Sequence, residues 1–193
     1  MDKYRNKYRI ESARAQWWDY KQSGIYFITI CTRQREHYFG EIVNGQMKLS
    51  SIGIIANILW YEITQHATDI ELGEFIVMPN HIHGILILSP NDNNNDNNVE
   101  TRHALSQTKP TLISKEIPLQ SSPSRFQNQG KNTVSSIIGG YKSVVTKHVR
   151  RLGFEFAWQT RFHDHIIRND QSFRRISEYI VDNPARWESD CFY

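Results

Sequence analysis

Residues 77–88, Val-Met-Pro-Asn-His-Ile-His-Gly-Ile-Leu-Ile-Leu, predict a central strand of the fold and carry the first candidate site. Pro79-Asn80 predicts a break in the chain, and the apolar run 85–88 is typical of a buried strand. Residues i and i+2 of a strand point to the same face, so His81 and His83 present two imidazoles side by side while Ile82 enters the core. Such a pair on a rigid strand is a candidate site for a divalent metal.

A His-x-His pair also arises without a metal, either on the exposed face of an edge strand or stacked under a helix. Two histidines do not complete a metal site, because a metal needs more than two ligands. A catalytic metal also keeps some of its coordination positions open for the substrate. The sequence offers four candidates for a third ligand, and the residues alone do not choose among them: His148, His163, Asp164 and His165.

The segments around this stretch predict the remaining elements. β-branched and aromatic residues favour strands, Asn44-Gly45 is typical of a type I′ hairpin turn, and apolar spacings of three and four favour helices. We expect strands at 24–33, 71–79, 80–88 and 162–168, a hairpin at 38–49, and helices at 52–66, 133–151 and 170–181. Without the hairpin the order begins β-α-β-β-α-β, the split βαβ pattern. This predicts an α+β, ferredoxin-like fold with an antiparallel sheet and both helices on one face.

Two segments do not fit this pattern. Residues 1–23 mix basic residues with Trp17, Trp18 and Tyr20, and we interpret them as an N-terminal arm. Residues 89–131 are rich in Asn, Ser, Gln, Pro and Thr and cannot bury enough apolar area to offset their ordering entropy. We therefore expect one domain over 24–193, interrupted by a flexible polar insertion at 89–131.

Net charge, cysteine content and hydropathy indicate where the protein works and which partners to expect. The net charge of the 193 residues is only +3, so the position of the positive charge matters more than its total. The two cysteines, Cys31 and Cys191, have no spacing that pairs them, which favours a reduced, cytoplasmic protein. No apolar stretch approaches the ~20 residues of a membrane span, and the first residues lack the apolar core of a signal peptide, so no membrane partner is expected.

Tyr141 is the second candidate for chemistry. A helical tyrosine is most often a half-buried core residue, but a phenol is also a candidate covalent nucleophile. Gly139-Gly140 before it costs about 2 kcal/mol relative to two alanines, which indicates close approach by another group. Positive side chains follow the phenol at Lys142, Lys147, Arg150 and Arg151. Such a run is usually a solvated face, and together with Arg161 it is also a candidate surface for binding phosphates.

Residues 158–168 repeat the histidine pattern. By strand alternation His163 and His165 share a face, between Arg161 and Arg168. They are either two surface histidines on an edge strand or a further contact to a metal or a phosphate.

Several blocks in this order resemble one known family. The matching residues are 26–32, Met78-Pro79-Asn80-His81-Ile82-His83-Gly84, residues 140–143, Trp158-Gln159, Phe162, residues 164–168, Tyr179-Ile180 and Asn183-Pro184. Together they are similar to the REP-associated tyrosine transposases, relatives of the small single-strand transposases with a His-hydrophobic-His motif (HUH). The resemblance covers 24–88 and 132–187.

The resemblance implies a metal-dependent endonuclease and transposase that cleaves and rejoins single-stranded, hairpin-containing DNA through a 5′-phosphotyrosine link. It implies that His81 and His83 bind Mg²⁺ or Mn²⁺ and that Tyr141 is the nucleophile. In insertion-sequence relatives a Gln one turn after the tyrosine completes the metal site, but Val145 stands there in this chain, so His165 is the expected third ligand. Either a monomer or a homodimer is compatible with the family.

Two other classes stay open on the sequence. A nucleic-acid-binding module of the same fold would bind DNA without cutting it. A metal-dependent hydrolase would use a bound water, and so would not need a tyrosine.

Overall fold

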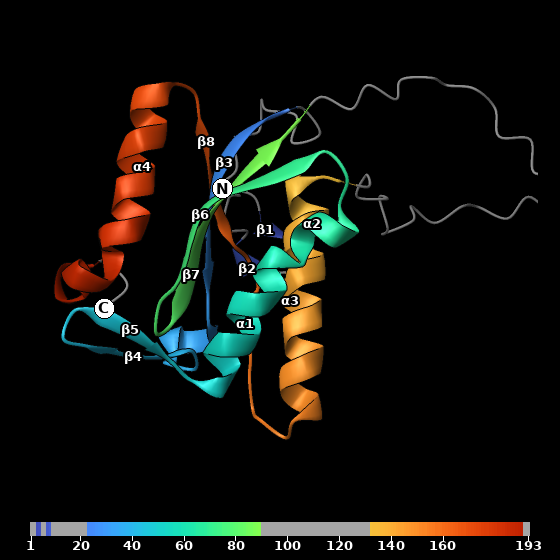
Figure 1. Ribbon diagram of the computed structural model, residues 1–193. Helices are drawn as coiled ribbons and strands as arrows, with labels where there is room; N and C mark the ends of the chain where they lie inside the picture. The colour runs from blue at the N-terminus through green and yellow to red at the C-terminus, as the bar shows by residue number, and fades with distance from the viewer. Residues whose placement is uncertain (1–2, 5–6, 9–22, 90–131, 191–193) are drawn as a thin grey trace, which may run out of the picture.

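The computed structural model describes residues 3–4, 7–8, 23–89 and 132–190 (Figure 1). Most of the expected N-terminal arm and nearly all of the expected insertion at 89–131 lie outside these residues, so both stay predictions. The two short strands β1 (Lys3–Tyr4) and β2 (Lys7–Tyr8) pair with each other in an antiparallel arrangement.

A four-stranded antiparallel sheet forms the centre of the protein. Its strands are β3 (Gly24–Cys31), β6 (Ile70–Val77), β7 (His81–Leu88) and β8 (His163–Ile167), in the order β6-β7-β3-β8. All three neighbouring pairs are antiparallel. The predicted ferredoxin-like α+β fold is therefore confirmed, with the motif strand β7 in the middle of the sheet.

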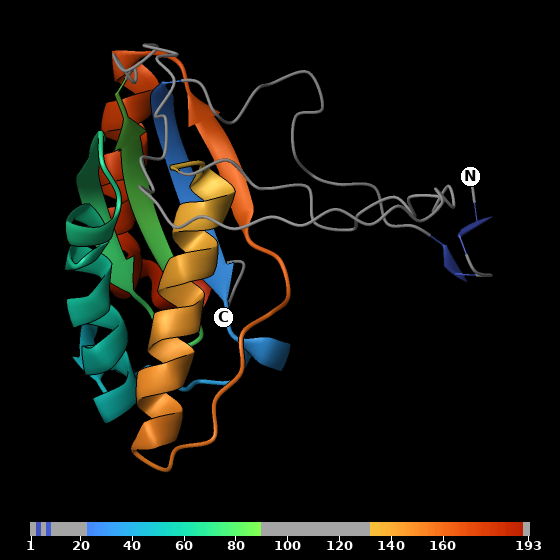
Figure 2. The same ribbon diagram turned by 90° about the vertical axis from the view of Figure 1, so that its right-hand side faces the viewer.

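Helices cover both faces of this sheet (Figures 1 and 2). The helices α1 (Ser51–Tyr61) and α3 (Val134–Arg151) lie on one face, as predicted, together with the short α2 (Ile63–His66). The third predicted helix, α4 (Asp170–Asp182), covers the opposite face. Two buried clusters result, one under α1 and α3 and a smaller one under α4.

Local signals in the sequence set the ends of these elements. Ser50 caps α1 by accepting a hydrogen bond from the backbone of Gly53 at 3.1 Å. Between β4 (Gly40–Val43) and β5 (Gln46–Leu49), Asn44 and Gly45 have φ of 52° and 71°, which confirms the predicted type I′ turn. A 3₁₀ turn, η1 (Arg33–Arg35), follows β3, and a second, η2 (Asn183–Ser189), follows α4.

Gly84 in the histidine motif has a packing role. A Cβ at this position would lie 2.3 Å from the ring of Trp60, which is fully buried in α1. Only glycine leaves room here for the indole to pack against β7. None of the helices that the structure describes is long and apolar enough to span a lipid bilayer.

Candidate metal centre

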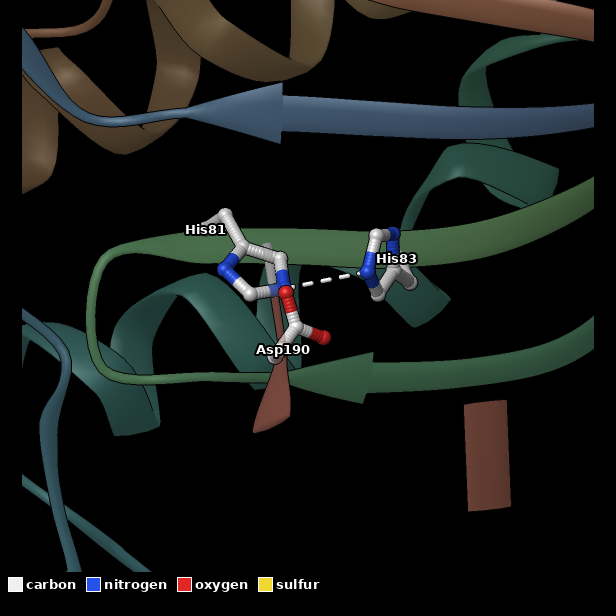
Figure 3. Close-up of side chains that lie close together, drawn as sticks. All are labelled: His81, His83 and Asp190. Carbon is white, nitrogen blue, oxygen red and sulfur yellow. Dashed lines mark hydrogen bonds between the residues drawn. The ribbon is translucent and has the colours of Figure 1, made fainter. Parts of the chain in front are cut away.

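The two motif histidines lie on the face of β7 that α4 covers. Their Nε2 atoms are 3.0 Å apart, and the side chains are 0% and 1% exposed (Figure 3). The prediction that His81 and His83 share a face is confirmed. Adjacent ligands on an octahedral ion with bonds of about 2.1 Å lie about 3.0 Å apart, so this spacing fits two ligands of one Mg²⁺-like ion.

The other ring nitrogen of each histidine is held by an oxygen. Nδ1 of His81 lies 2.8 Å from Oδ1 of Asn80, an atom that only accepts, so the proton of this ring lies on Nδ1. Nδ1 of His83 lies 3.0 Å from the hydroxyl of Thr29. These partners orient both rings with Nε2 toward the common point, as in metal sites whose ligands are fixed by a second layer of hydrogen bonds.

Burial keeps both imidazoles neutral. Desolvation lowers the pKa of His81 to about 4, with the charge of Asp190 opposing the shift and that of Arg35 adding to it. Desolvation, and then the charge of its neighbour His81, lower the pKa of His83 well below its usual value. Neutral imidazoles are the form that binds a metal.

Asp190 completes a group of three candidate ligands. Its carboxylate and the two imidazoles offer ligand atoms that all lie within 4.8 Å of one another. Asp190 comes directly after η2, which brings the end of the described chain over β7 (Figure 3). No spacing in the sequence points to this residue, because the turn after Pro184 places it through tertiary packing alone.

The expected third ligand, His165, lies elsewhere. It is exposed on β8 and pairs in register with Phe27 of β3, which separates β8 from β7. Two strand spacings put it about 10 Å from β7. His165 therefore does not lie with the imidazole pair, and Asp190 takes its place as the candidate third ligand. The other three candidates, His148, His163 and Asp164, are not in the group either.

Tyr179 of α4 is the phenol that reaches this centre. Its hydroxyl lies 3.2 Å from Nε2 of His83 and donates a hydrogen bond to Oδ2 of Asp190 at 3.0 Å. Its ring lies against the imidazole of His83, with centroids 5.2 Å apart. One feature of the sequence could have indicated Tyr179. Asn183, a polar residue, follows it one helical turn later.

Asn183 lies beside the centre and contacts Asp190. It is 2% exposed, and its Nδ2 donates to Oδ2 of Asp190 at 2.8 Å. Its Oδ1 is buried and has no hydrogen-bond partner among the described residues. A buried amide oxygen without a partner is costly, and it is also the hard oxygen donor that Mg²⁺ and Mn²⁺ prefer. The donor set of two imidazoles and one carboxylate fits such an ion, and this amide oxygen is a candidate fourth donor.

Tyr141 is far from this arrangement. Its hydroxyl donates to the backbone oxygen of Ala56 in α1 at 2.8 Å, and its ring meets that of Trp60 edge-on at 5.3 Å. Burial raises the pKa of this phenol well above its usual value, which disfavours the nucleophilic phenolate. The sheet separates Tyr141 from the imidazole pair, so the placement on which its expected catalytic role rested is corrected.

The two glycines before Tyr141 also differ from expectation. A Cβ on Gly139 or Gly140 would meet nothing within 4 Å, so no group approaches the helix closely there. They lie on an open part of the surface of α3.

The cations proposed to bind DNA fall into two kinds. Lys142 donates from Nζ to the backbone oxygen of Gln159 at 2.6 Å and lies 5.8 Å from the centroid of the Trp158 ring. Burial lowers the pKa of Lys142, and this side chain ties α3 to the following loop. Exposed positions that remain available to a phosphate are Lys147, Arg150, Arg151 and Arg161.

Comparisons with known proteins place this geometry in context. No family model matches the chain. A Haemophilus influenzae protein of uncharacterised function is 33% identical over 184 residues, which are 94% of this chain and 92% of that protein. Among solved structures, a REP-associated tyrosine transposase bound to a REP hairpin matches with a TM-score of 0.55 and 17% identity, over 92% of this chain and 74% of that one.

Proposed function

The chain belongs to one family with the Haemophilus influenzae protein and has the fold of the REP-associated tyrosine transposases, and on that premise we propose that it is a metal-dependent tyrosine transposase that cleaves and rejoins single-stranded DNA. The observation that carries the proposal is the position of Tyr179, whose hydroxyl lies 3.2 Å from a nitrogen of the imidazole pair. A phenol beside a cluster of metal ligands has the placement that a nucleophile needs.

The residues that would hold the ion are His81, His83, Asp190 and the amide oxygen of Asn183. A bound Mg²⁺ or Mn²⁺ supplies Lewis acidity, drawing charge from a phosphate oxygen. The protein keeps both imidazoles neutral by burial and fixes their orientation through Asn80 and Thr29.

Tyr179 supplies the covalent step. Its oxygen attacks the phosphorus of a phosphodiester, the bond to the 3′ oxygen breaks, and a 3′-hydroxyl leaves while the 5′-phosphate stays on the tyrosine. An unperturbed phenol has a pKa near 10, so the proton must leave during attack. Asp190 already accepts the hydrogen bond from this hydroxyl and is the acceptor at hand. A later 3′-hydroxyl reverses the reaction and joins a new strand.

Access to the centre requires a local movement. Both imidazoles are buried, and the ring of Trp187 in η2 stacks on His81 with centroids 5.9 Å apart. Trp187 of η2 is thus one of the side chains that cover the imidazole pair in this arrangement. The described ligands and Tyr179 all belong to one chain, which favours a site that one protomer completes by itself.

The substrate class follows from the fold neighbour and the exposed cations. The solved transposase binds a REP hairpin, and we extend this to hairpin DNA for the present chain. Lys147, Arg150, Arg151 and Arg161 would offset backbone charge.

Labelled hairpin DNA with Mn²⁺ tests the proposal on a denaturing gel. The wild-type chain is expected to form a covalent adduct, Tyr179→Phe to form none, and Tyr141→Phe to form it as the wild type does. Cleavage without an adduct that persists in Tyr179→Phe would indicate a hydrolase that uses water. Binding without any cleavage would indicate a DNA-binding module.

A further inference from the structure

A second pocket lies outside the metal centre, between η1 and the loop after α3. It has a volume of about 450 Å³, which is within the range of small-ligand sites. None of its lining residues belongs to the metal centre. Those that matter for recognition are Arg33, Glu36, Tyr38, Arg150, Phe154 and Glu155.

Aromatic rings form the apolar part of this pocket. Phe156 is 4% exposed and meets the ring of Tyr38 edge-on, with centroids 5.3 Å apart. Phe154 lines the same pocket but is 41% exposed and makes no ring contact with any residue that the structure describes. A phenylalanine left open beside a pocket offers a free face on which a flat ligand can stack.

Charged side chains of both signs form the polar part. Arg33 and Arg150 bring donors only, and Glu36 and Glu155 bring acceptors only. Within the described part of the chain none of the four forms an ion pair within 4.0 Å. The two carboxylates disfavour a phosphate, whereas the edge of a nucleobase carries both donors and acceptors and can use both kinds of side chain.

The wall formed by η1 has a strained backbone. Gln34 and Arg35 both have positive φ, 54° and 59°, a conformation that side chains other than glycine rarely adopt. The backbone nitrogens of Thr32 and Arg33 anchor the turn by donating to Asn80 and Ala157, each at 2.9 Å. Backbone held in such a conformation is found preferentially at ligand sites.

The same turn connects the pocket to the metal centre. Its anchor Asn80 directly precedes His81, and the charge of Arg35 contributes to lowering the pKa of that histidine. The turn therefore contacts both the pocket and the residue directly before the motif strand.

We infer that this pocket binds one unpaired nucleobase of the DNA strand, stacked on Phe154 and hydrogen-bonded along its edge by the arginine and glutamate side chains. The inference rests on the proposed function, since it assumes a single-stranded DNA substrate. It assigns to the pocket the recognition of a base, while the metal centre acts on the backbone.

Fluorescence anisotropy with the full chain tests this inference. The probe is a fluorescein-labelled hairpin with single-stranded flanks, in EDTA so that no cleavage occurs, and each flank nucleotide is replaced in turn by an abasic unit. Phe154→Ala is expected to weaken binding of the intact probe about tenfold, the effect of losing one stacked base. One abasic position should weaken wild-type binding to the same extent and have no further effect on Phe154→Ala. Leu152→Ala is the matched control, since Leu152 is 64% exposed and does not line the pocket.

Wild-type affinity in Phe154→Ala, or equal additional losses at every abasic position, would overturn the inference, as would a wild-type chain that binds no probe. Thermal melting of Phe154→Ala at the wild-type temperature excludes unfolding as the cause of a loss. Adduct formation at saturating protein concentration reports on the proposed function separately. An adduct together with unchanged affinity of Phe154→Ala would reject the base pocket and leave the nuclease intact.

Discussion

The hydroxyl of Tyr179 and Nε2 of His83 lie 3.2 Å apart, although 96 residues separate them in the chain. One belongs to α4 and the other to the central strand β7, and the same hydroxyl also contacts Asp190. This contact places a phenol beside the imidazole pair on the face of the sheet beneath α4, which is why we propose that face as the reactive one. The face beneath α1 and α3, where Tyr141 lies, is core.

Substitution of single candidate ligands should show whether Asp190 or His165 is the third metal ligand. His81→Ala is expected to abolish Mn²⁺ binding measured by titration calorimetry, because one of two buried imidazoles is lost. Asp190→Ala should weaken it by at least about tenfold, by analogy with the loss of supporting groups at metal sites. His165→Ala should leave the affinity unchanged, since that imidazole is exposed on β8. A weakened His165→Ala with an unaffected Asp190→Ala would reverse this assignment.

Acid should destabilise the metal-free protein through the buried imidazoles. The pKa of His81 is lowered from 6.5 to about 4, so the unfolded chain binds a proton more readily than the folded one. This contribution to stability is complete above pH 6.5 and is lost as the pH falls toward 4, by about 3 kcal/mol in all. The melting temperature in EDTA should therefore fall less between pH 7 and 4.5 in His81→Gln than in the wild type. Parallel curves would show that this imidazole does not set the acid response.

Tyr141→Phe should affect stability and leave catalysis unchanged. The hydroxyl of Tyr141 is buried and donates to the backbone of Ala56, so its loss removes one buried hydrogen bond, worth about 1 kcal/mol. Urea unfolding should report that loss. A variant with wild-type stability but no adduct would point back to a catalytic Tyr141.

Two glycines should respond in opposite directions to alanine. Gly84→Ala places a Cβ 2.3 Å from the ring of Trp60 and should destabilise the protein by about 1–3 kcal/mol, the usual cost of overpacking. Gly139→Ala meets no atom within 4 Å in α3 and should stabilise it by about 1 kcal/mol through helix propensity. Urea unfolding of the two variants measures both effects. Equal stability of Gly84→Ala and the wild type would contradict the packing of α1 on β7.

The sequence predicts the fold well because its strongest signals are local. Alternation around His81, the Asn44-Gly45 turn and the apolar spacing of α3 each depend on near neighbours. The metal pair follows from strand alternation in the same way. Spacing alone does not say which face of the sheet a helix covers, so it does not distinguish Tyr141 of α3 from Tyr179 of α4 as the tyrosine that lies beside the imidazoles.

The position of Asp190 beside the imidazoles could not be predicted from the sequence, for a related reason. Asp190 approaches the imidazoles because Pro184 ends α4 and η2 turns the chain back over the sheet. Such a return depends on tertiary packing, and no residue pattern around Asp190 marks it as a ligand. His165 carried the right chemistry, but its strand lies at the edge of the sheet.

Mass spectrometry of the trypsin-digested DNA adduct identifies the tyrosine that carries the DNA. Cleavage after Lys and Arg places Tyr141 and Tyr179 in separate peptides, residues 132–142 and 176–186, each of which contains one tyrosine. After nuclease trimming, the residual 5′-phosphonucleotide should be found on the peptide 176–186. A nucleotide on the peptide 132–142 would contradict the account.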